Sequence, residues 1–321
     1  MFEPTFVTVR NGAVDIRVAT LGVGPLIVCV HGWPELWYSW RHQMAHFAAR
    51  GFRVAAIDVR GYGGSSKPTA IAAYSMAELA GDVAAVIDEL ADGSAIVFGH
   101  DWGAPIAYNT ARLHAAKVSA VAGLSVPYAP IGENNPLDMW KQVYADRFFY
   151  QTYICDEPGV AEAEVGADSA RALRMIYYAA SGDADRSLFQ EKGPDEGLLD
   201  GLVDPDPFPA WLSPDDLAVY GEAFDAGGWQ GPFNRYRAQP IDALEIGSMP
   251  DQNLHQPATF IGGELDGVRN FLPDLDLYDF AGNSIDDLRG TTVIAGAGHW
   301  VQQEAPDATN AALEAFIDTL G

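Results

Sequence analysis

Asp101 stands in the run Gly99-His100-Asp101-Trp102-Gly103, in a setting that suits a nucleophile. Residues 94–98 before it are almost wholly apolar and residues 104–113 after it have helical character, so a sharp strand-to-helix turn is predicted. The flanking glycines permit a crowded backbone, and the start of the helix offers N–H groups to an anion. Because an ionised carboxylate is already a nucleophile at neutral pH, Asp101 predicts attack on a saturated carbon. Such a reaction is alkyl transfer, whereas a serine at this position would transfer an acyl group.

Two later loops supply an acid and a histidine. The strand-like residues 259–261 lead to Asp266, and the strand-like residues 291–294 lead to His299. A nucleophile, an acid and a histidine in this order, each placed after a strand, form a triad pattern. We expect His299 to activate water and Asp266 to orient its ring. Glu264 is the alternative acid, and Asp266 is preferred because it lies deeper in the loop and precedes a glycine.

Backbone donors for this site are predicted in another loop. Residues 26–30 have the apolar pattern of a buried strand and run into His31-Gly32-Trp33-Pro34-Glu35. Such a loop can aim the backbone N–H of Trp33, together with that of Trp102, at one point above the nucleophile, which is the geometry of an oxyanion hole. Pro34 is expected to fix this loop, and a cis peptide bond is one way to do so.

Four segments together resemble the signature segments of the epoxide hydrolases of the α/β-hydrolase fold. These segments are His31-Gly32-Trp33-Pro34-Glu35, Asp58-Val59-Arg60-Gly61-Tyr62-Gly63-Gly64-Ser65, Gly99-His100-Asp101-Trp102-Gly103 and Gly298-His299-Trp300. The resemblance runs from about residue 4 to the end of the chain. It implies a mostly parallel, doubly wound α/β sheet with an inserted helical cap, and the conversion of epoxides to vicinal diols. The intermediate would be an alkyl ester on Asp101, hydrolysed by water that His299 activates.

The same resemblance implies two cap tyrosines that hydrogen-bond the epoxide oxygen. Residues 148–162 are similar to the segment that carries the first, which places it at Tyr150. Residues 234–237 are similar to the segment that carries the second, which places it at Tyr236. The chain departs from the family pattern at Arg235, where a tryptophan is usual, and by one extra residue in the run that follows Tyr153. Both departures concern the shape of the pocket.

The group that leaves the carbon separates two substrate classes. An opening epoxide gives an alkoxide that needs a proton, and Tyr150 and Tyr236 are O–H donors. A halide needs only N–H donors such as the indoles of Trp33 or Trp102, so a haloalkane dehalogenase is the alternative enzyme. A non-catalytic, ligand-binding member of the fold would have lost a triad residue, and none is missing. The substrate pocket is expected to include Trp33, Pro34, Trp102, Gln151 and Trp300.

Strand-like and helix-like patterns alternate from residue 6 to about 127 and again from about 256 to 321, which predicts one sheet with helices on both faces. The chain between them lacks buried-strand runs and is predicted to be a helical lid. The expected division is therefore a core over 1–127 and 255–321 with a cap over 128–254. Helices are predicted at residues 76–90, 161–180 and 214–224, the last with Ser213 as N-cap and Pro214 at its first position.

The composition restricts the partners. The 321 residues carry a formal net charge of −25, with 48% hydrophobic and 20% charged residues, as in a globular chain. So acidic a surface repels phosphate backbones and anionic headgroups, so neither nucleic acid nor membrane is an expected partner. The N-terminus lacks the pattern of a signal peptide, and no apolar run reaches the about 18 residues of a membrane span. Cys29 and Cys155 are expected to be free thiols in a reducing cytoplasm.

No cofactor or metal ion is expected. The glycines of residues 61–67 lack the spacing of a phosphate-binding loop. His42 and His46 stand four residues apart on a predicted helix, but the sequence suggests no third ligand. His31 and His100 are expected to be structural, hydrogen-bonding residues. The expected partners are a small-molecule epoxide and water, and the choice between a monomer and a homodimer stays open.

Overall fold

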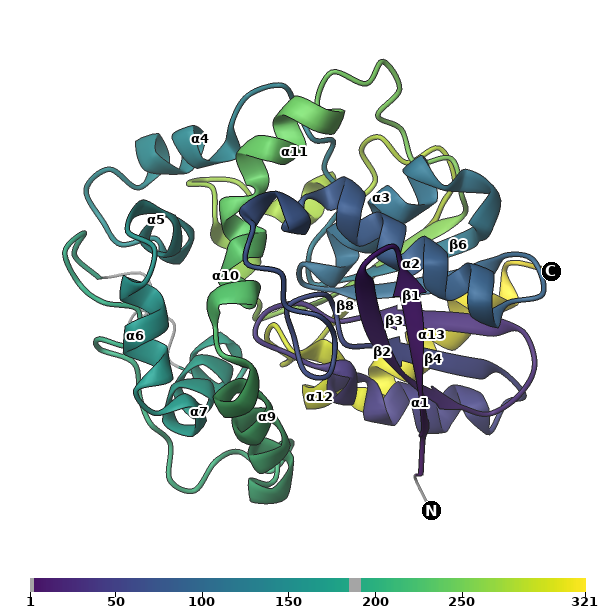
Figure 1. Cartoon of the computed structure of the whole chain (residues 1–321), viewed down its shortest axis with the longest axis horizontal. Coiled ribbons are helices and arrows are strands. Elements are labelled where there is room, and N and C mark those ends of the chain that lie inside the picture. Colours follow the sequence, from purple (N-terminus) through teal and green to yellow (C-terminus); the bar gives the residue numbers. More distant parts are fainter. Residues whose placement is uncertain (1–2, 185–191) are drawn as a thin grey trace.

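The structure is a computed structural model that describes residues 3–184 and 192–321. Its central sheet consists of β1 (Thr5–Asn11), β2 (Val14–Leu21), β3 (Leu26–Val30), β4 (Arg53–Ile57), β5 (Ala95–His100), β6 (Val118–Leu124), β7 (Ala258–Gly263) and β8 (Leu288–Ile294). The strand order is β1-β2-β4-β3-β5-β6-β7-β8 (Figure 1). β2 pairs antiparallel with β1 and β4, and all other neighbours pair parallel. The predicted mostly parallel sheet is confirmed.

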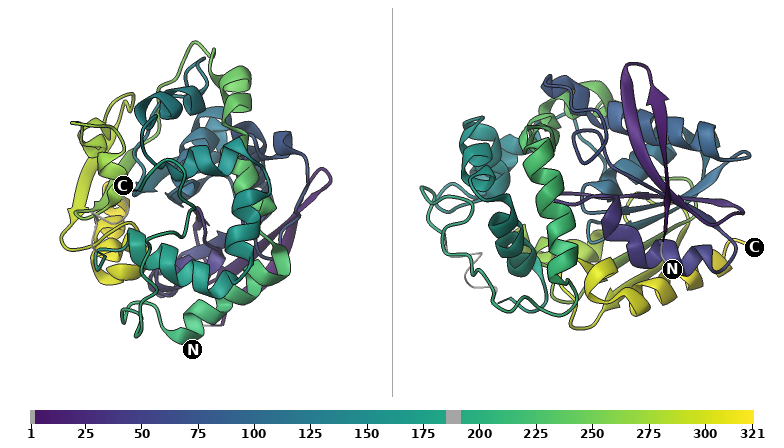
Figure 2. Two further views of the ribbon diagram at one scale, coloured as in Figure 1. Left: turned by 90° about the vertical axis from the view of Figure 1, so that its left-hand side faces the viewer. Right: turned by 60° about the horizontal axis from the view of Figure 1, so that its bottom comes forward.

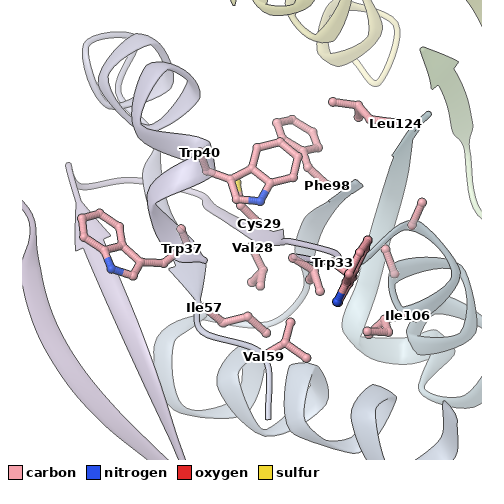
Figure 3. Packing of buried hydrophobic residues seen from close by; sticks show 14 of the residues in the cluster. Val28, Cys29, Trp33, Trp37, Trp40, Ile57, Val59, Phe98, Ile106 and Leu124 are labelled. Atoms are coloured by element: carbon pink, nitrogen blue, oxygen red, sulfur yellow. The ribbon is translucent and has the colours of Figure 1, made fainter. Parts of the chain in front are cut away.

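Helices cover both faces of this sheet. The core helices are α1 (Arg41–Ala48), α2 (Met76–Leu90), α3 (Gly103–Leu113), α12 (Val301–Glu304) and α13 (Pro306–Asp318). α2 and α3 pack on one face, and α1 and α13 pack on the other. All five residues of β3 are therefore buried, without the alternation of a strand that faces water. Around β3, Cys29 lies with Trp40 and Phe98, whereas Val28 lies toward Ile57 (Figure 3).

The helix predicted over residues 76–90 is α2, with the same bounds. Ser75 caps its first turn, because its hydroxyl oxygen accepts the N–H of Glu78 (3.5 Å). Leu79, Val83 and Ile87 recur at helical spacing and are buried against the sheet and its neighbours. The apolar face that the sequence predicts is thus the face that the core uses.

The chain between β6 and β7 forms an inserted helical cap, and its described residues contain no strand. Its helices are α4 (Pro136–Val143), α5 (Tyr150–Asp156), α6 (Val160–Gly166), α7 (Ser169–Ala180), α9 (Pro214–Gly227), α10 (Gln230–Arg237) and α11 (Gln239–Ile246). The predicted start of α9 is confirmed, with Ser213 in a capping box and Pro214 in the first turn. The single helix predicted over residues 161–180 is wrong. The chain divides there into α6 and α7, because Asp168 leaves the helical conformation and its carboxylate caps the N–H of Arg171 (2.9 Å).

The cap lies on one side of the sheet, over the carboxyl ends of the parallel strands (Figures 1 and 2). α10 lies between the core and the cap helices α5 and α6 (Figure 1). It packs on the short 3-10 helix η2 (Ile71–Tyr74), and α11 packs on α2. Cap residues therefore face the loops after β3, β5, β7 and β8, which carry the predicted site.

Within residues 3–184 and 192–321, no helix has both the length and the apolar character needed to cross a bilayer. Cys29 is buried in β3, Cys155 lies in α5, and both thiols are free. Burial raises the pKa of Cys29 well above its ordinary value and that of Cys155 to about 12. Neither sulfur is a thiolate at neutral pH.

Two glycines allow the loops after β3 and β5 to approach each other. A Cβ atom on Gly103 would lie 2.0 Å from the carbonyl oxygen of Val30, and a Cβ atom on Gly32 would lie 2.3 Å from Oδ1 of Asp101. Only glycine fits at these distances. The close contact between the two loops fixes the place of Asp101 above the sheet.

Gly103→Ala is expected to destabilise the protein by about 1–3 kcal/mol or more, because the Val30 carbonyl cannot move without breaking the pairing of β3 with β5. The matched control is Gly81→Ala inside α2, where the new Cβ would lie 3.5 Å from Nδ2 of Asn11. That control is expected to be neutral or slightly stabilising, since alanine favours a helix. Urea unfolding measures both variants, and a parental midpoint for Gly103→Ala would contradict the expectation.

Candidate active site

Asp101 lies at the predicted strand-to-helix turn, between β5 and α3, and its backbone is left-handed with φ at 51°. A residue other than glycine is strained in this conformation, and such strained residues cluster at functional sites. Oδ1 of Asp101 accepts the backbone N–H of Trp33 (2.7 Å). The Asp101 residue is only 8% exposed, so its carboxylate meets little solvent.

His299 lies between Asp101 and Asp266. Its Nε2 is 3.3 Å from Oδ2 of Asp101, and its Nδ1 is 3.0 and 3.1 Å from the two carboxylate oxygens of Asp266. Asp266 also accepts the N–H of Val268 (2.9 Å) and the hydroxyl of Tyr278 (2.7 Å). The three residues predicted to form a triad are thus brought together, although they are up to 198 positions apart in the chain.

Glu264, the alternative acid of the sequence analysis, lies at the surface. Its Oε2 accepts the backbone N–H of Gly296 (2.9 Å), in the loop after β8. The residue is exposed, whereas Asp266 is 1% exposed. Asp266, not Glu264, is therefore the carboxylate at the histidine.

Mutual attraction of charges sets the direction of the pKa shifts of Asp101, Asp266 and His299. Burial alone would raise the pKa of Asp101 and of Asp266, but the charge and hydrogen bonds of His299 outweigh it and hold both pKa values below their ordinary range. Burial alone would lower the pKa of His299, but the two carboxylates outweigh it and raise that pKa well above its ordinary value. The resting site therefore holds an imidazolium between two carboxylates.

The backbone of His299 is anchored on both sides of the peptide. Its N–H donates to the carbonyl oxygen of Ala180, the last residue of α7 in the cap (2.9 Å). Its carbonyl oxygen accepts from Nε2 of His100 (2.8 Å) and from Oγ of Ser125 (2.6 Å). Cap and core together therefore fix the position of the His299 ring.

Glu304 reinforces this anchor and was not singled out in the sequence. Its carboxylate accepts the backbone N–H groups on both sides of His299, those of Gly298 and Trp300 (2.9 Å each). It also accepts the N–H of Gly182 from the cap (2.8 Å). No local pattern marks Glu304, because its partners come from another part of the fold.

A second buried contact between a carboxylate and a histidine lies beneath the site. Glu35 accepts the N–H of Gly32 (3.0 Å) and the side-chain amides of Gln302 and Gln303 (2.8 and 3.4 Å), so its oxygens serve as acceptors. Nδ1 of His100 is 2.6 Å from the same carboxylate. Nε2 of His100 is 2.8 Å from the carbonyl oxygen of His299, so this ring lies between Glu35 and the backbone of His299. The sequence analysis predicted a structural role for His100 but assigned none to Glu35. The feature that could have revealed Glu35 is a carboxylate in a loop whose other residues are apolar or buried.

The predicted backbone donors lie on two sides of Asp101. The N–H of Trp33 already points at Oδ1 of Asp101 (2.7 Å). Trp102 directly precedes α3, where backbone N–H groups have no partner within the helix. The Trp33 N–H is thus one donor fixed at Oδ1, and the Trp102 N–H stays a predicted second donor.

The two predicted tyrosines come from different cap helices and meet at Trp33. Tyr150 begins α5 and Tyr236 lies in α10, with their ring centres 5.7 Å apart. The Trp33 ring is 6.0 Å from Tyr150 and 5.9 Å from Tyr236. Oη of Tyr150 accepts from Nε2 of Gln151 (3.2 Å), and the buried Oη of Tyr236 has no hydrogen-bond partner. The Tyr236 hydroxyl is thus a buried donor that no described protein group uses.

Both phenols are held in the neutral form. Burial raises the pKa of Tyr150, and the negative charge of Asp101 raises it further. Burial also raises the pKa of Tyr236 well above its ordinary value, with smaller contributions from Tyr150 and Asp101. The two side chains therefore present O–H donors at neutral pH, within electrostatic reach of Asp101.

A cavity of about 680 Å³ opens onto these residues. Asp101, Asp266 and His299 contribute polar atoms to its lining, and the volume suits a small organic molecule. The rest of the lining is largely aromatic or aliphatic, including Trp33, Tyr150, Trp300, Phe149, Phe271, Ile176 and Leu198. The cavity thus combines a charged, reactive end with apolar walls.

Three residues expected in the pocket, Pro34, Trp102 and Gln151, do not line this cavity. Pro34 follows a cis peptide bond, and its carbonyl accepts the hydroxyl of Tyr177 (2.9 Å). Gln151 is turned toward Tyr150 and Gln239, and Trp102 is covered by cap side chains. Trp33 and Trp300 do line the cavity, whereas Tyr236 is fully buried beside it.

In the described part of the chain, no group of three or more His, Cys, Asp or Glu side chains is arranged to hold a metal ion. His42 and His46 both lie in α1, and His46 is 3.5 Å from Glu314. Burial lowers the pKa of His42 to about 4. His31 is fully buried, with Nδ1 2.8 Å from the carbonyl of Gly32 and Nε2 accepting the N–H of Val59 (3.0 Å).

The chain was compared with known families, proteins and structures. Residues 25–154 match the family model of the alpha/beta hydrolase fold. Epoxide hydrolase A of Mycobacterium tuberculosis (strain ATCC 25618 / H37Rv) is 37% identical over 325 aligned residues, which cover 100% of this chain and 99% of that protein. Epoxide hydrolase B of the same strain is 37% identical over 331 aligned residues, which cover 92% of each chain.

Solved structures give the same result. An epoxide hydrolase from an endophytic Streptomyces has a TM-score of 0.93 and 40% identity, with 99% of this chain and 96% of that chain covered. Epoxide hydrolase A from Mycobacterium thermoresistibile has a TM-score of 0.90 and 37% identity, with 98% of each chain covered. The chain therefore belongs to the epoxide hydrolases of the α/β-hydrolase fold.

Proposed function

We propose that the protein hydrolyses epoxides to vicinal diols through an ester on Asp101. The observation that carries this proposal is the buried Asp101 carboxylate, with one oxygen on the Trp33 N–H (2.7 Å) and the other near His299 (3.3 Å). The neutral phenols of Tyr150 and Tyr236 support an alkoxide as the leaving group, since a halide needs no proton.

Ring opening forms the ester. Oδ2 of Asp101 attacks an epoxide carbon while Oδ1 stays on the Trp33 N–H. The carbon–oxygen bond of the epoxide breaks, and the new alkoxide takes a proton from Tyr150 or Tyr236. This step leaves Asp101 uncharged, so His299 loses one of the two carboxylates that raise its pKa. The imidazolium then gives its proton to the phenolate, and a neutral imidazole remains.

Ester hydrolysis restores the resting state. Neutral His299 takes a proton from water, and the hydroxide attacks the carbonyl carbon of the ester on Asp101. The negative charge that develops on Oδ1 is stabilised by the N–H groups of Trp33 and Trp102. The bond between that carbon and the alkyl oxygen breaks, and the diol oxygen takes the proton of the new carboxylic acid. His299 stays protonated between Asp101 and Asp266, which is the arrangement of the resting site.

The boundaries of the cap are part of this proposal. A core over residues 1–127 and 255–321 and a cap over 128–254 agree with the helices between β6 and β7. The cap supplies the proton donors Tyr150 and Tyr236, and the core supplies Asp101, Asp266 and His299. Trp33 and Trp300 form part of the substrate pocket.

The net charge and the free thiols support proposals for the partners and the location of the protein. The formal net charge of −25 disfavours nucleic acid and anionic membranes, so a small epoxide and water are the proposed partners. Two free thiols support a cytoplasmic location. Size-exclusion chromatography with light scattering distinguishes a monomer from a homodimer.

His299→Gln is expected to trap the ester, because alkylation needs the Asp101 carboxylate and a phenol as proton donor but no base, whereas hydrolysis needs a base. Incubated with a panel of aryl and alkyl epoxides, the variant should gain the mass of one substrate on the peptide that contains Asp101. Mass spectrometry detects the adduct, and adding Asp101→Asn should abolish it. The parental protein should release diols from the epoxides and no halide from a matched haloalkane panel. Faster release of halide than of diol would reverse the assignment of the substrate class.

Tyr150→Phe and Tyr236→Phe are each expected to slow ester formation, on the general scale of about 10²- to 10⁴-fold for a lost acid catalyst. The effect is smaller if the partner phenol compensates, and the double variant should lose more than either single one without additivity. Single-turnover kinetics measures ester formation and decay separately. The matched control is Tyr153→Phe, whose hydroxyl donates to Glu164 (2.7 Å). A double variant that opens epoxides at the parental rate would remove both phenols from the mechanism.

Asp101→Asn is expected to lower the pKa of His299 by about one to three units, because an uncharged amide replaces one of the two carboxylates that raise it. The imidazole is then neutral at a lower pH than in the parental protein, as the hydrolysis step requires. An NMR titration of the ring protons measures the pKa. His42, in α1, serves as the internal control. A His299 pKa that stays unchanged or rises would count against the proposed role of the Asp101 charge.

A further inference from the structure

Arg235 is a buried cation beside the site, and the proposed mechanism does not use it. The residue is 2% exposed and lies in α10 immediately before Tyr236. Its guanidinium pairs with the carboxylate of Asp242 in α11 and donates to the carbonyl oxygen of Tyr74 in η2. A cation in the cap is thus bonded to both the cap and the core.

Asp242 extends this connection into the core. Its Oδ1 accepts the backbone N–H of Met76 (2.6 Å), the first residue of α2. The Asp242 residue is 4% exposed, so the whole pair is removed from solvent. One ion pair therefore joins α10, α11 and the start of α2.

The guanidinium also reaches the turn that carries the nucleophile. Its central carbon lies 4.7 Å from the ring centre of Trp102, the residue after Asp101. The ring of Tyr236 meets the same indole edge to face, with centres 5.3 Å apart and planes at 81°. Arg235 and Tyr236 are neighbours in α10, so this helix contacts Trp102 through both side chains.

We propose that Arg235, paired with Asp242, is a positioning residue for ring opening, which fixes α10 against Trp102 and so sets the place of the Tyr236 hydroxyl relative to Asp101. The inference rests on the proposed function of Tyr236. Arg235 acts through Tyr236, and in the described chain it neither lines the cavity nor contacts His299.

The ion pair of Arg235 and Asp242 fixes the position of α10 more than it stabilises the fold. Replacing a buried ion pair by apolar side chains of similar volume is often neutral or stabilising, because two charges then avoid desolvation. Here Nε of Arg235 is buried without a hydrogen-bond partner, so the cation is not fully satisfied. The forked hydrogen bonds and the stacking on Trp102 instead specify one orientation of α10.

The effect should be confined to the first chemical step. His299 and Asp266 are held by Glu304, His100, Ala180 and Tyr278, and none of these bonds involves Arg235. Loss of the pair should therefore misplace the Tyr236 hydroxyl and leave the water-activating histidine in place. A displacement of about 1 Å can cost on the order of 10²-fold in rate.

The test compares Arg235→Met/Asp242→Leu with a matched buried pair in the core. Arg60 and Asp82 are each 2% exposed and share bonds of 2.8 and 2.7 Å, and they contact neither Tyr236 nor Trp102. Single-turnover kinetics with an epoxide measures ester formation and ester hydrolysis. Arg235→Met/Asp242→Leu should slow ester formation by about 10- to 100-fold and leave hydrolysis at the parental rate. Arg60→Met/Asp82→Leu should change neither rate, whatever its unfolding temperature.

Two further measurements separate positioning from a purely structural role. In a Tyr236→Phe background, Arg235→Met/Asp242→Leu should slow ester formation no further, because the group being positioned is gone. Arg235→Lys, which keeps the charge but loses the fork, should restore part of the rate. An equal loss in both steps, or a full loss that persists in the Tyr236→Phe background, would overturn the inference.

A crystal structure of Arg235→Met/Asp242→Leu tests the inference without turnover. The Tyr236 hydroxyl should shift by about 1 Å relative to Asp101. An unchanged Tyr236 position overturns the inference even if the protein hydrolyses epoxides. Conversely, absence of any ester on Asp101 in His299→Gln overturns the proposed function, whereas a shifted Tyr236 would still support the role of Arg235 in placing it.

Discussion

The arrangement of the site depends on one close backbone contact, between the loop after β3 and the start of α3. Gly103 lies against the Val30 carbonyl and Gly32 lies against the Asp101 carboxylate, and neither position has room for a Cβ atom. Asp101 has a left-handed backbone at this contact, and its Oδ1 accepts the Trp33 N–H. The other oxygen is left facing His299 (3.3 Å). The proposed roles of the two oxygens, one held and one attacking, follow from this asymmetry.

Charges alternate through the buried interior of the site. Asp101 and Asp266 flank His299, and behind His299 the carbonyl of its own backbone meets the His100 ring, which pairs with Glu35. Each carboxylate has an imidazole neighbour, so no buried anion is left without a cation or an N–H donor. When the charge of Asp101 disappears in an ester, the balance at His299 changes most. In the proposed mechanism, His299 pairs with the nucleophile in the resting state and becomes a base once the ester has formed.

Residues marked by local patterns were predictable from the sequence. Buried strands that end in glycine-rich loops led to Asp101, Asp266 and His299, and the structure brings these three side chains together. Tyr150 and Tyr236 came from a family resemblance, since an aromatic residue in a helix has no chemical signature of its own. Glu304, Glu35 and Tyr278 escaped notice because their partners lie far away in the chain, so only the fold reveals them. The break at Asp168 and the inward turn of Gln151 are likewise decided by capping and tertiary contacts, which outweigh helical periodicity.

The cap carries part of the scaffold for the histidine, and this has a consequence for how such proteins diversify. The carbonyls of Ala180 and Tyr177, at the end of α7, receive the His299 backbone N–H and the Trp300 indole N–H. The insertion is therefore no detachable module on a finished enzyme. A chimera that borrows a cap from a relative inherits the cavity walls of that cap and also replaces a support of His299. Recombination between such genes is constrained to breakpoints that carry the end of α7 and the loop of His299 from the same parent.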